Sequence, residues 1–86
     1  MEITDDFKNE ILTNSKAIES IEVFYKKKEK FKGQLAFVKD DPFEIKIFDK
    51  SNKADEAEHL IYFGRAEEIT LNYFDGTVKV FKDSID

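Results

Sequence analysis

A lysine-rich run, Lys26-Lys27-Lys28-Glu29-Lys30 with Lys32 beyond it, is the one cationic cluster in the sequence of this 86-residue chain. Lysine ammonium groups contact nucleic-acid phosphates, and the neighbouring rings of Phe24 and Tyr25 are suited to stacking on bases. Such runs are also common solvated turns between strands, and the net charge of −5 favours this second interpretation. The alternative nucleic-acid site comprises Lys26, Lys27, Lys28, Lys30, Lys32 and Arg65.

Aromatic side chains indicate a different kind of site, an apolar surface for another protein. In strand alternation five phenylalanines fall opposite the predicted core face, namely Phe24, Phe48, Phe63, Phe74 and Phe81. A short helix covers fewer rings than this, so the surplus favours self-association or capture of a protein partner. Acidic residues could steer that partner by imitating a phosphate backbone. The predicted protein-interaction residues are Phe63, Tyr73, Phe74, Phe81, Glu67 and Glu68.

Catalytic and metal-binding chemistry is poorly represented. The chain has no cysteine, and no carboxylate is spaced from the lone histidine, His59, in a metal-type or triad-type pattern. We expect His59 to be a cross-strand surface residue. Asp40-Asp41-Pro42 is ordinary turn chemistry, and the serines lack a nucleophile elbow. The sequence therefore predicts no enzyme, no metal site and no cofactor.

Length and composition predict one small domain over residues 1–86. The acidic N-terminus is unlike a signal peptide, and no apolar run approaches the roughly 18 residues that span a bilayer. We therefore expect a cytoplasmic protein without a membrane partner. Charge is uneven, because residues 1–22 and 54–86 carry about −4 and about −5, whereas residues 23–53 carry about +4. Thirteen lysines beside one arginine are typical of a low-GC bacterium or its phage.

An amphipathic helix is predicted within residues 1–16. Thr4 can cap it by accepting a hydrogen bond from an early backbone N–H. Ile3, Phe7 and Ile11 recur at a four-residue spacing that forms one apolar stripe. Such a short helix is marginal alone, so it must dock on the rest of the domain to persist.

Antiparallel strands are predicted over the remainder of the chain. Alternation indicates strands at 18–26, 31–37, 43–48, 58–63, 69–73 and 77–82, with a hairpin loop at 50–57. One face of the second strand carries Phe31, Gly33, Leu35 and Phe37. Asp75-Gly76 is typical of a two-residue type I′ turn. The predicted fold class is mainly β (α+β), a short N-terminal helix followed by a five- to six-stranded antiparallel barrel.

Two segments resemble a known family of small barrels. Phe31-Lys32-Gly33-Gln34-Leu35, then Asp40 and the strand at 43–47, is similar to the bent second strand, aspartate-bearing turn and next strand of Sm-like proteins. That family includes the bacterial RNA chaperone Hfq. The stretch from His59 to Ala66, with Ile69 after it, is similar to the family's later strands and tight turn. The likeness covers residues 18–72, extends to YolD-like proteins, and implies an SH3-like or Sm-like barrel.

The resemblance also implies an oligomeric RNA-binding protein, with one departure. Sm-like proteins commonly place a base-reading polar group where this chain has Phe43 and Glu44. Our first hypothesis is therefore a non-catalytic protein-binding or regulatory module, an inhibitor acting through acidic and aromatic surfaces. The alternative is an oligomeric Sm-like RNA-binding protein that uses the lysine run and Arg65 on phosphates.

Overall fold

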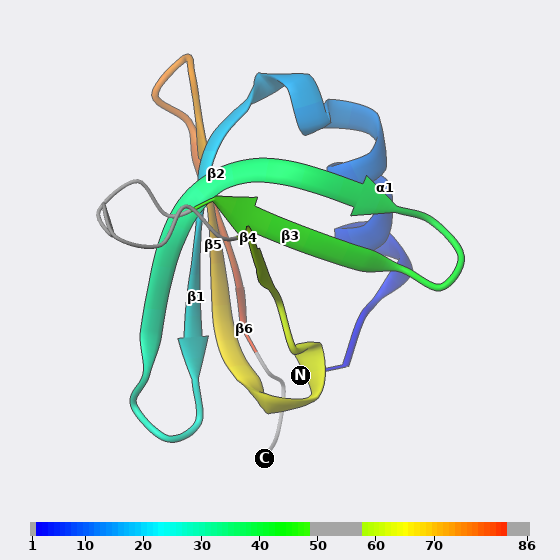
Figure 1. Ribbon diagram of the computed structural model, residues 1–86. Helices are drawn as coiled ribbons and strands as arrows, with labels where there is room; N and C mark the ends of the chain where they lie inside the picture. Colours follow the sequence, from blue (N-terminus) through cyan, green and yellow to red (C-terminus); the bar gives the residue numbers. More distant parts are fainter. Residues whose placement is uncertain (1, 49–57, 83–86) are drawn as a thin grey trace.

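The computed structural model describes residues 2–48 and 58–82 as one α-helix and a curved antiparallel sheet (Figure 1). The elements in chain order are α1 (Asp5–Asn14), η1 (Ser15–Ala17), β1 (Ile18–Tyr25), β2 (Lys30–Lys39), β3 (Glu44–Phe48), β4 (Glu58–Leu60), η2 (Phe63–Arg65), β5 (Ala66–Tyr73) and β6 (Val78–Lys82). This order confirms the mainly β (α+β) class. The predicted hairpin loop at 50–57 lies outside the described residues, and no helix within them is long and apolar enough to cross a membrane.

The six strands form one open sheet in the order β4-β3-β2-β1-β5-β6. Every neighbouring pair is antiparallel. A closed barrel would need pairing between the two outermost strands. β4 instead pairs with β3 over three residues, and the chain then leaves the sheet towards η2. The predicted strand at 58–63 is therefore shorter, and the sheet is not closed within the described part of the chain.

β2 bends where it changes partners. Its first part pairs with β1, where Gly33 faces Ile21, and its second part pairs with β3, where Gln34 faces Phe48. A Cβ atom on Gly33 would lie 2.5 Å from the carbonyl oxygen of Phe48. Glycine is required at this bend because the two backbones approach too closely for any side chain. Figure 1 shows the resulting long curve of β2.

A β-bulge reverses the inward face of β2 near its end. The register with β3 shifts between Leu35 and Phe37, so Val38 packs against the core and Phe37 is 41% exposed. The ammonium of Lys46, the cross-strand partner, lies 5.2 Å from the centroid of the Phe37 ring. The prediction that Phe37 shares the face of Leu35 is wrong, because a bulge residue shifts the alternation by one.

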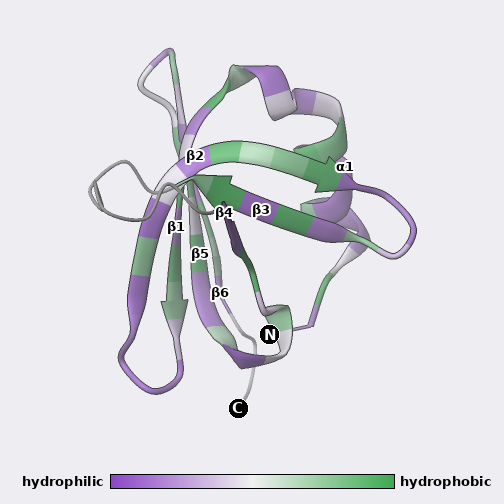
Figure 2. Ribbon diagram, in the orientation of Figure 1, coloured by the Kyte–Doolittle hydropathy of each residue, from purple (hydrophilic) through white to green (hydrophobic). Residues whose placement is uncertain are grey.

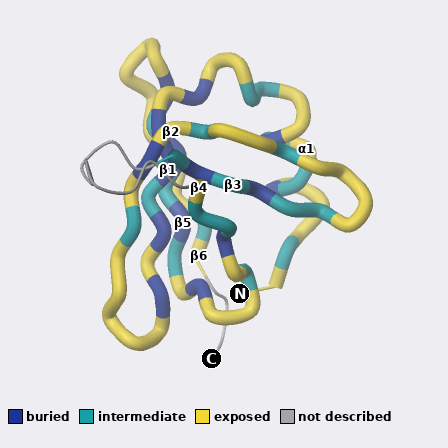
Figure 3. The backbone as a smooth tube through the Cα atoms, viewed as in Figure 1, coloured by how far each residue is buried: buried dark blue, intermediate teal, exposed yellow. Residues whose placement is uncertain are grey.

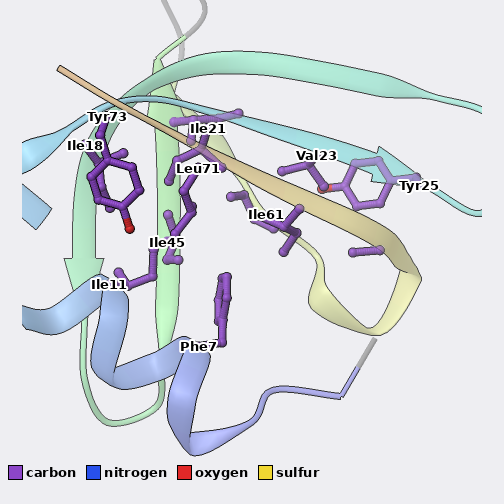
Figure 4. Packing of buried hydrophobic residues seen from close by; sticks show 13 residues of the cluster. Phe7, Ile11, Ile18, Ile21, Val23, Tyr25, Ile45, Ile61, Leu71 and Tyr73 are labelled. Carbon is purple, nitrogen blue, oxygen red and sulfur yellow. The ribbon is translucent and has the colours of Figure 1, made fainter. Parts of the chain in front are cut away.

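The core lies between α1 and the sheet. The Thr4 hydroxyl accepts a hydrogen bond from the Phe7 N–H at 3.2 Å, which confirms the predicted cap. Phe7 and Ile11 are fully buried and point from the helix towards the strands (Figure 4). Hydrophobic and hydrophilic residues alternate along β3 (Figure 2), and the turn between β1 and β2 is exposed (Figure 3). The other buried core residues are Ile18, Ile21, Val23, Tyr25, Ile45, Ile47, Ile61, Ala66, Ile69, Leu71 and Tyr73.

Phe63 and Phe81 pack against this core and do not lie on the predicted surface. Their ring centroids lie 5.9 Å and 4.9 Å from that of Phe7. Phe81 pairs with Ile69 across β5 and β6, and cross-strand partners share a face, so Phe81 faces inward with the buried Ile69. The predicted outward orientation of these two rings is therefore wrong. Pairing with β5 decides which residues of β6 face inward. The alternation within five residues of sequence does not show which of the two faces that is.

The turn between β5 and β6 differs in type from the prediction. A type I′ turn needs positive φ at both central residues, but Gly76 has a φ of 91° and Asp75 does not have a positive φ. The Gly76 N–H donates to the Tyr73 carbonyl at 3.1 Å, and the Tyr73 N–H donates to the Thr77 carbonyl at 2.9 Å. These bonds describe a type I turn followed by a left-handed glycine.

Candidate binding pocket

A pocket of about 260 Å³ lies between the β1–β2 turn and the segment that joins β4 to η2. It forms because β1 pairs with both β2 and β5, so the end of β1 meets the beginning of β5. The lining combines aromatic rings with cationic side chains, and we call it the aromatic–basic pocket. Its residues are Tyr25, Lys26, Lys27, Glu29, Phe31, His59, Tyr62, Gly64 and Arg65.

Tyr25 is the most buried aromatic side chain of the pocket, with 5% of its surface exposed. Its hydroxyl accepts a hydrogen bond from the Tyr62 N–H at 3.0 Å and lies 3.5 Å from Nε2 of His59. Burial raises the pKa of the Tyr25 hydroxyl, so this group is neutral at physiological pH. The deep polar group of the pocket is therefore already hydrogen-bonded to the protein.

One side of the pocket is a pair of stacked rings. The centroids of Phe31 and His59 lie 4.2 Å apart, with 17° between the ring planes. Phe31 faces Val23 across β1 and β2, and His59 faces Ile47 across β3 and β4. Both partners are buried, so the register directs both rings to the inner side of the sheet. The prediction that His59 is a surface residue is wrong, because its ring is half-buried against Phe31.

Cations also border the pocket. The Arg65 guanidinium carbon lies 4.6 Å from the ring centroid of Tyr62, whose side chain is 46% exposed. The Lys26 N–H donates to the Arg65 carbonyl at 3.0 Å, which fixes the lysine turn beside η2. Among the residues that the structure describes, Arg65 and Lys27 have no carboxylate within ion-pair distance. Their positive charges are therefore available to a ligand.

The structure divides the predicted nucleic-acid residues into two groups. Lys26, Lys27 and Arg65 line the pocket, while Lys28 is exposed at the tip of the turn. The remaining two lie on the outer face of the sheet, because Lys30 and Lys32 face Phe24 and Glu22 across β1 and β2. Lys30 is neutralised there by the Glu22 carboxylate at 3.1 Å.

The predicted protein-interaction residues do not form one surface. Tyr73 is buried and its hydroxyl donates a hydrogen bond to Glu10, while Phe63 and Phe81 pack on Phe7. Phe74 is 68% exposed in the β5–β6 turn. Glu67 and Glu68 lie on β5, at a hollow of about 310 Å³ that is also lined by Phe24 and Lys82. These residues belong to three separate places.

The sequence pattern predicts a stacking role for Tyr25 but none for Tyr62 or Phe31. Tyr62 flanks the Gly64-Arg65 turn and Phe31 flanks the lysine run, so their positions beside the cations were the signal that could have found them. Within residues 2–48 and 58–82 no group of three or more His, Cys, Asp or Glu side chains could hold a metal ion. No family model, curated protein or solved structure matches the chain. The resemblance to Sm-like proteins therefore stays a prediction.

Proposed function

We propose that the chain is a non-catalytic binding module whose aromatic–basic pocket captures a nucleotide unit of single-stranded nucleic acid. One observation carries the proposal: Lys26, Lys27 and Arg65 meet the rings of Tyr62 and Phe31 around a single cavity. Proteins that bind single strands combine cations for the phosphates with aromatic side chains on which bases stack. Duplex nucleic acid would not reach the rings, because its bases are already stacked.

Electrostatics support an anionic ligand at this position. The pocket contains three cations and one carboxylate, that of Glu29. The chain as a whole is acidic, so the local charge and not the total charge attracts the ligand. The Tyr25 hydroxyl is hydrogen-bonded within the protein, so a bound base would be held by its ring faces more than by its edges.

A protein ligand is less well supported by the geometry. Phe63, Tyr73 and Phe81, three of the four predicted aromatic anchors, contribute to the core. An acidic peptide with one aromatic side chain could still enter the pocket, since an apolar anchor in a pocket is typical of protein interfaces. The first hypothesis, a protein-binding or regulatory module, is therefore the outcome that the test must separate from nucleic-acid capture.

The test compares variants in binding to a short labelled single-stranded oligonucleotide. Tyr62→Ala should weaken binding by roughly 5- to 150-fold, because one base–aromatic stack contributes about 1–3 kcal/mol. Arg65→Gln should weaken binding and reduce the slope of log affinity against log salt by about one. Lys32→Gln, on the opposite face, is the matched control and should bind like the wild type. Equal losses in all three variants, or binding of an acidic aromatic peptide with none to the oligonucleotide, would contradict nucleic-acid capture.

A further inference from the structure

We infer, resting on the proposed function, that the pocket takes one nucleotide bearing a phosphomonoester, either as a free nucleoside monophosphate or as the phosphorylated end of a strand. The pocket is small. Pockets that bury a drug-sized ligand span roughly 300–1,000 Å³, and this pocket, at about 260 Å³, is smaller. A cavity of this size suits a single nucleotide better than several successive bases.

Positive charge does not continue from the pocket along β2. A protein that follows a nucleic-acid backbone needs a positively charged groove along the strand. Here Lys30 and Lys32, which lie further along the chain, are on the outer face, and Lys30 is bound to Glu22. Within the described residues Lys27 and Arg65 at the pocket have no ion pair, and Lys28 is exposed at the tip of the same turn.

A carboxylate also lies at the pocket, because Glu29 lines it with its side chain exposed. A second phosphate that left the pocket within a Debye length of Glu29, about 8–10 Å, would be repelled. Lengthening the strand therefore adds little favourable contact.

The charge of the ligand's phosphate follows from the same rim. A phosphomonoester carries about −1.5 to −2 at pH 7 and offers three acceptor oxygens, whereas an internal diester carries about −1. The Arg65 guanidinium lies over the Tyr62 ring, with its carbon 4.6 Å from the ring centroid, and its planar fork of donors is suited to bidentate phosphate binding. Two or more cations at one rim match the monoester better than the diester.

Calorimetric titration of the full chain with defined nucleotides tests this inference. The ligands are a nucleoside monophosphate, the nucleoside alone, and decanucleotides with and without a terminal phosphate. We expect the monophosphate and the phosphorylated decanucleotide to bind within about threefold of each other, and removal of the terminal phosphate to weaken either by about tenfold or more. Arg65→Lys should lose much of this preference, because an ammonium does not provide the bidentate fork, whereas Lys32→Gln should keep it.

The possible failures are distinguishable. An affinity that rises tenfold or more with strand length, or equal binding without the terminal phosphate, would overturn the single-nucleotide inference and leave nucleic-acid capture standing. Absence of binding to every ligand in the set, with amide NMR spectra that show a folded protein, would overturn both. A phosphate preference unchanged in Arg65→Lys and Arg65→Gln would also overturn the inference, because it would place the phosphate away from this rim.

Discussion

Lys28 occupies, in the turn between β1 and β2, the position that Gly76 occupies in the turn between β5 and β6. The N–H of Lys28 donates to the Tyr25 carbonyl at 3.0 Å, and that of Gly76 donates to the Tyr73 carbonyl at 3.1 Å. Their φ angles are 65° and 91°. A left-handed conformation costs a residue with a side chain roughly 1–2 kcal/mol, so the lysine turn beside the pocket carries backbone strain that the glycine turn does not.

Replacing Lys28 with glycine should therefore stabilise the protein. We expect Lys28→Gly to raise the free energy of unfolding by about 0.5–1 kcal/mol, since relief of the strain exceeds the added chain entropy of glycine. Gly76→Ala should lower it by a similar amount. Urea denaturation measures both changes. A Lys28→Gly variant that is less stable than the wild type would show that the positive φ of Lys28 does not carry the energetic cost assigned to it.

Gly33→Ala should destabilise the protein by about 1–3 kcal/mol, the range for inserting a methyl group into a packed site. The new Cβ would meet the backbone of Phe48 at 2.5 Å, so β2 and β3 must separate. Gly64→Ala is the matched control, because a Cβ there has nothing within 4 Å. Thermal denaturation of both variants checks the difference, and equal midpoints would refute the close approach of β2 and β3.

Glu10 should make a pH-dependent contribution to stability. Hydrogen bonds from Lys79 and Tyr73 hold the pKa of the Glu10 carboxyl below its ordinary value of 4.5. A lowered folded-state pKa stabilises the protein above pH 4.5, and the stabilisation is lost as the pH falls through the folded-state pKa. Glu10→Gln should therefore cost about 1 kcal/mol near pH 7, and this cost should fall as the pH is lowered through the folded-state pKa of Glu10, which lies below 4.5.

Comparison with a second variant isolates this effect. Hydrogen bonds from Asn72 and Lys30 similarly lower the pKa of Glu22. The pH dependence of wild-type stability therefore reflects several carboxyl groups together. Denaturation at several pH values gives the free energy of unfolding of the wild type and of Glu10→Gln. Subtracting one from the other at each pH removes the contribution of the other carboxyl groups. Glu19→Gln, at an exposed position of β1, is the control. A difference that stayed constant with pH would argue against the Glu10 hydrogen bonds.

Phe7 should be the most sensitive core position of the helix. Its ring lies within 6.2 Å of the rings of Phe43, Phe63 and Phe81, so truncation would leave a large cavity. Phe7→Ala should cost about 3–5 kcal/mol, whereas Leu12→Ala, at an exposed position of the same helix, should cost below about 1 kcal/mol. Denaturation curves for both variants give the two losses in the free energy of unfolding. Equal losses would contradict the central role of Phe7.

Local patterns in the sequence predicted the elements well. The Thr4 cap, the Phe7 and Ile11 stripe, and the alternation of Ile21, Val23 and Tyr25 depend on neighbouring residues, and all three occur in the structure. The bulge after Leu35 could not be predicted in this way. It depends on how β2 and β3 align, and one inserted residue leaves the hydrophobic pattern almost unchanged.

The candidate pocket could be predicted only in part. The lysine run and Arg65 were identified because their charge is visible in the sequence. The stacking of His59 on Phe31 was not, because these residues lie on β4 and β2, whose relative position depends on β3 between them. Charge can be read residue by residue, whereas ring contacts between distant strands require the register of every strand between them.

The long separation of the pocket's two halves has a consequence for folding. The hydrogen bond from Tyr62 to Tyr25 joins residues 37 positions apart, and the lining from β1 and β2 is separate in sequence from that around η2. Pairing of distant segments is slow and comes after local hairpins in time. The pocket is thus complete only when β5 has docked on β1. The proposed nucleotide ligand would bind none of the partly folded states, so it would raise the free energy of unfolding with the logarithm of its concentration once that concentration exceeds the Kd.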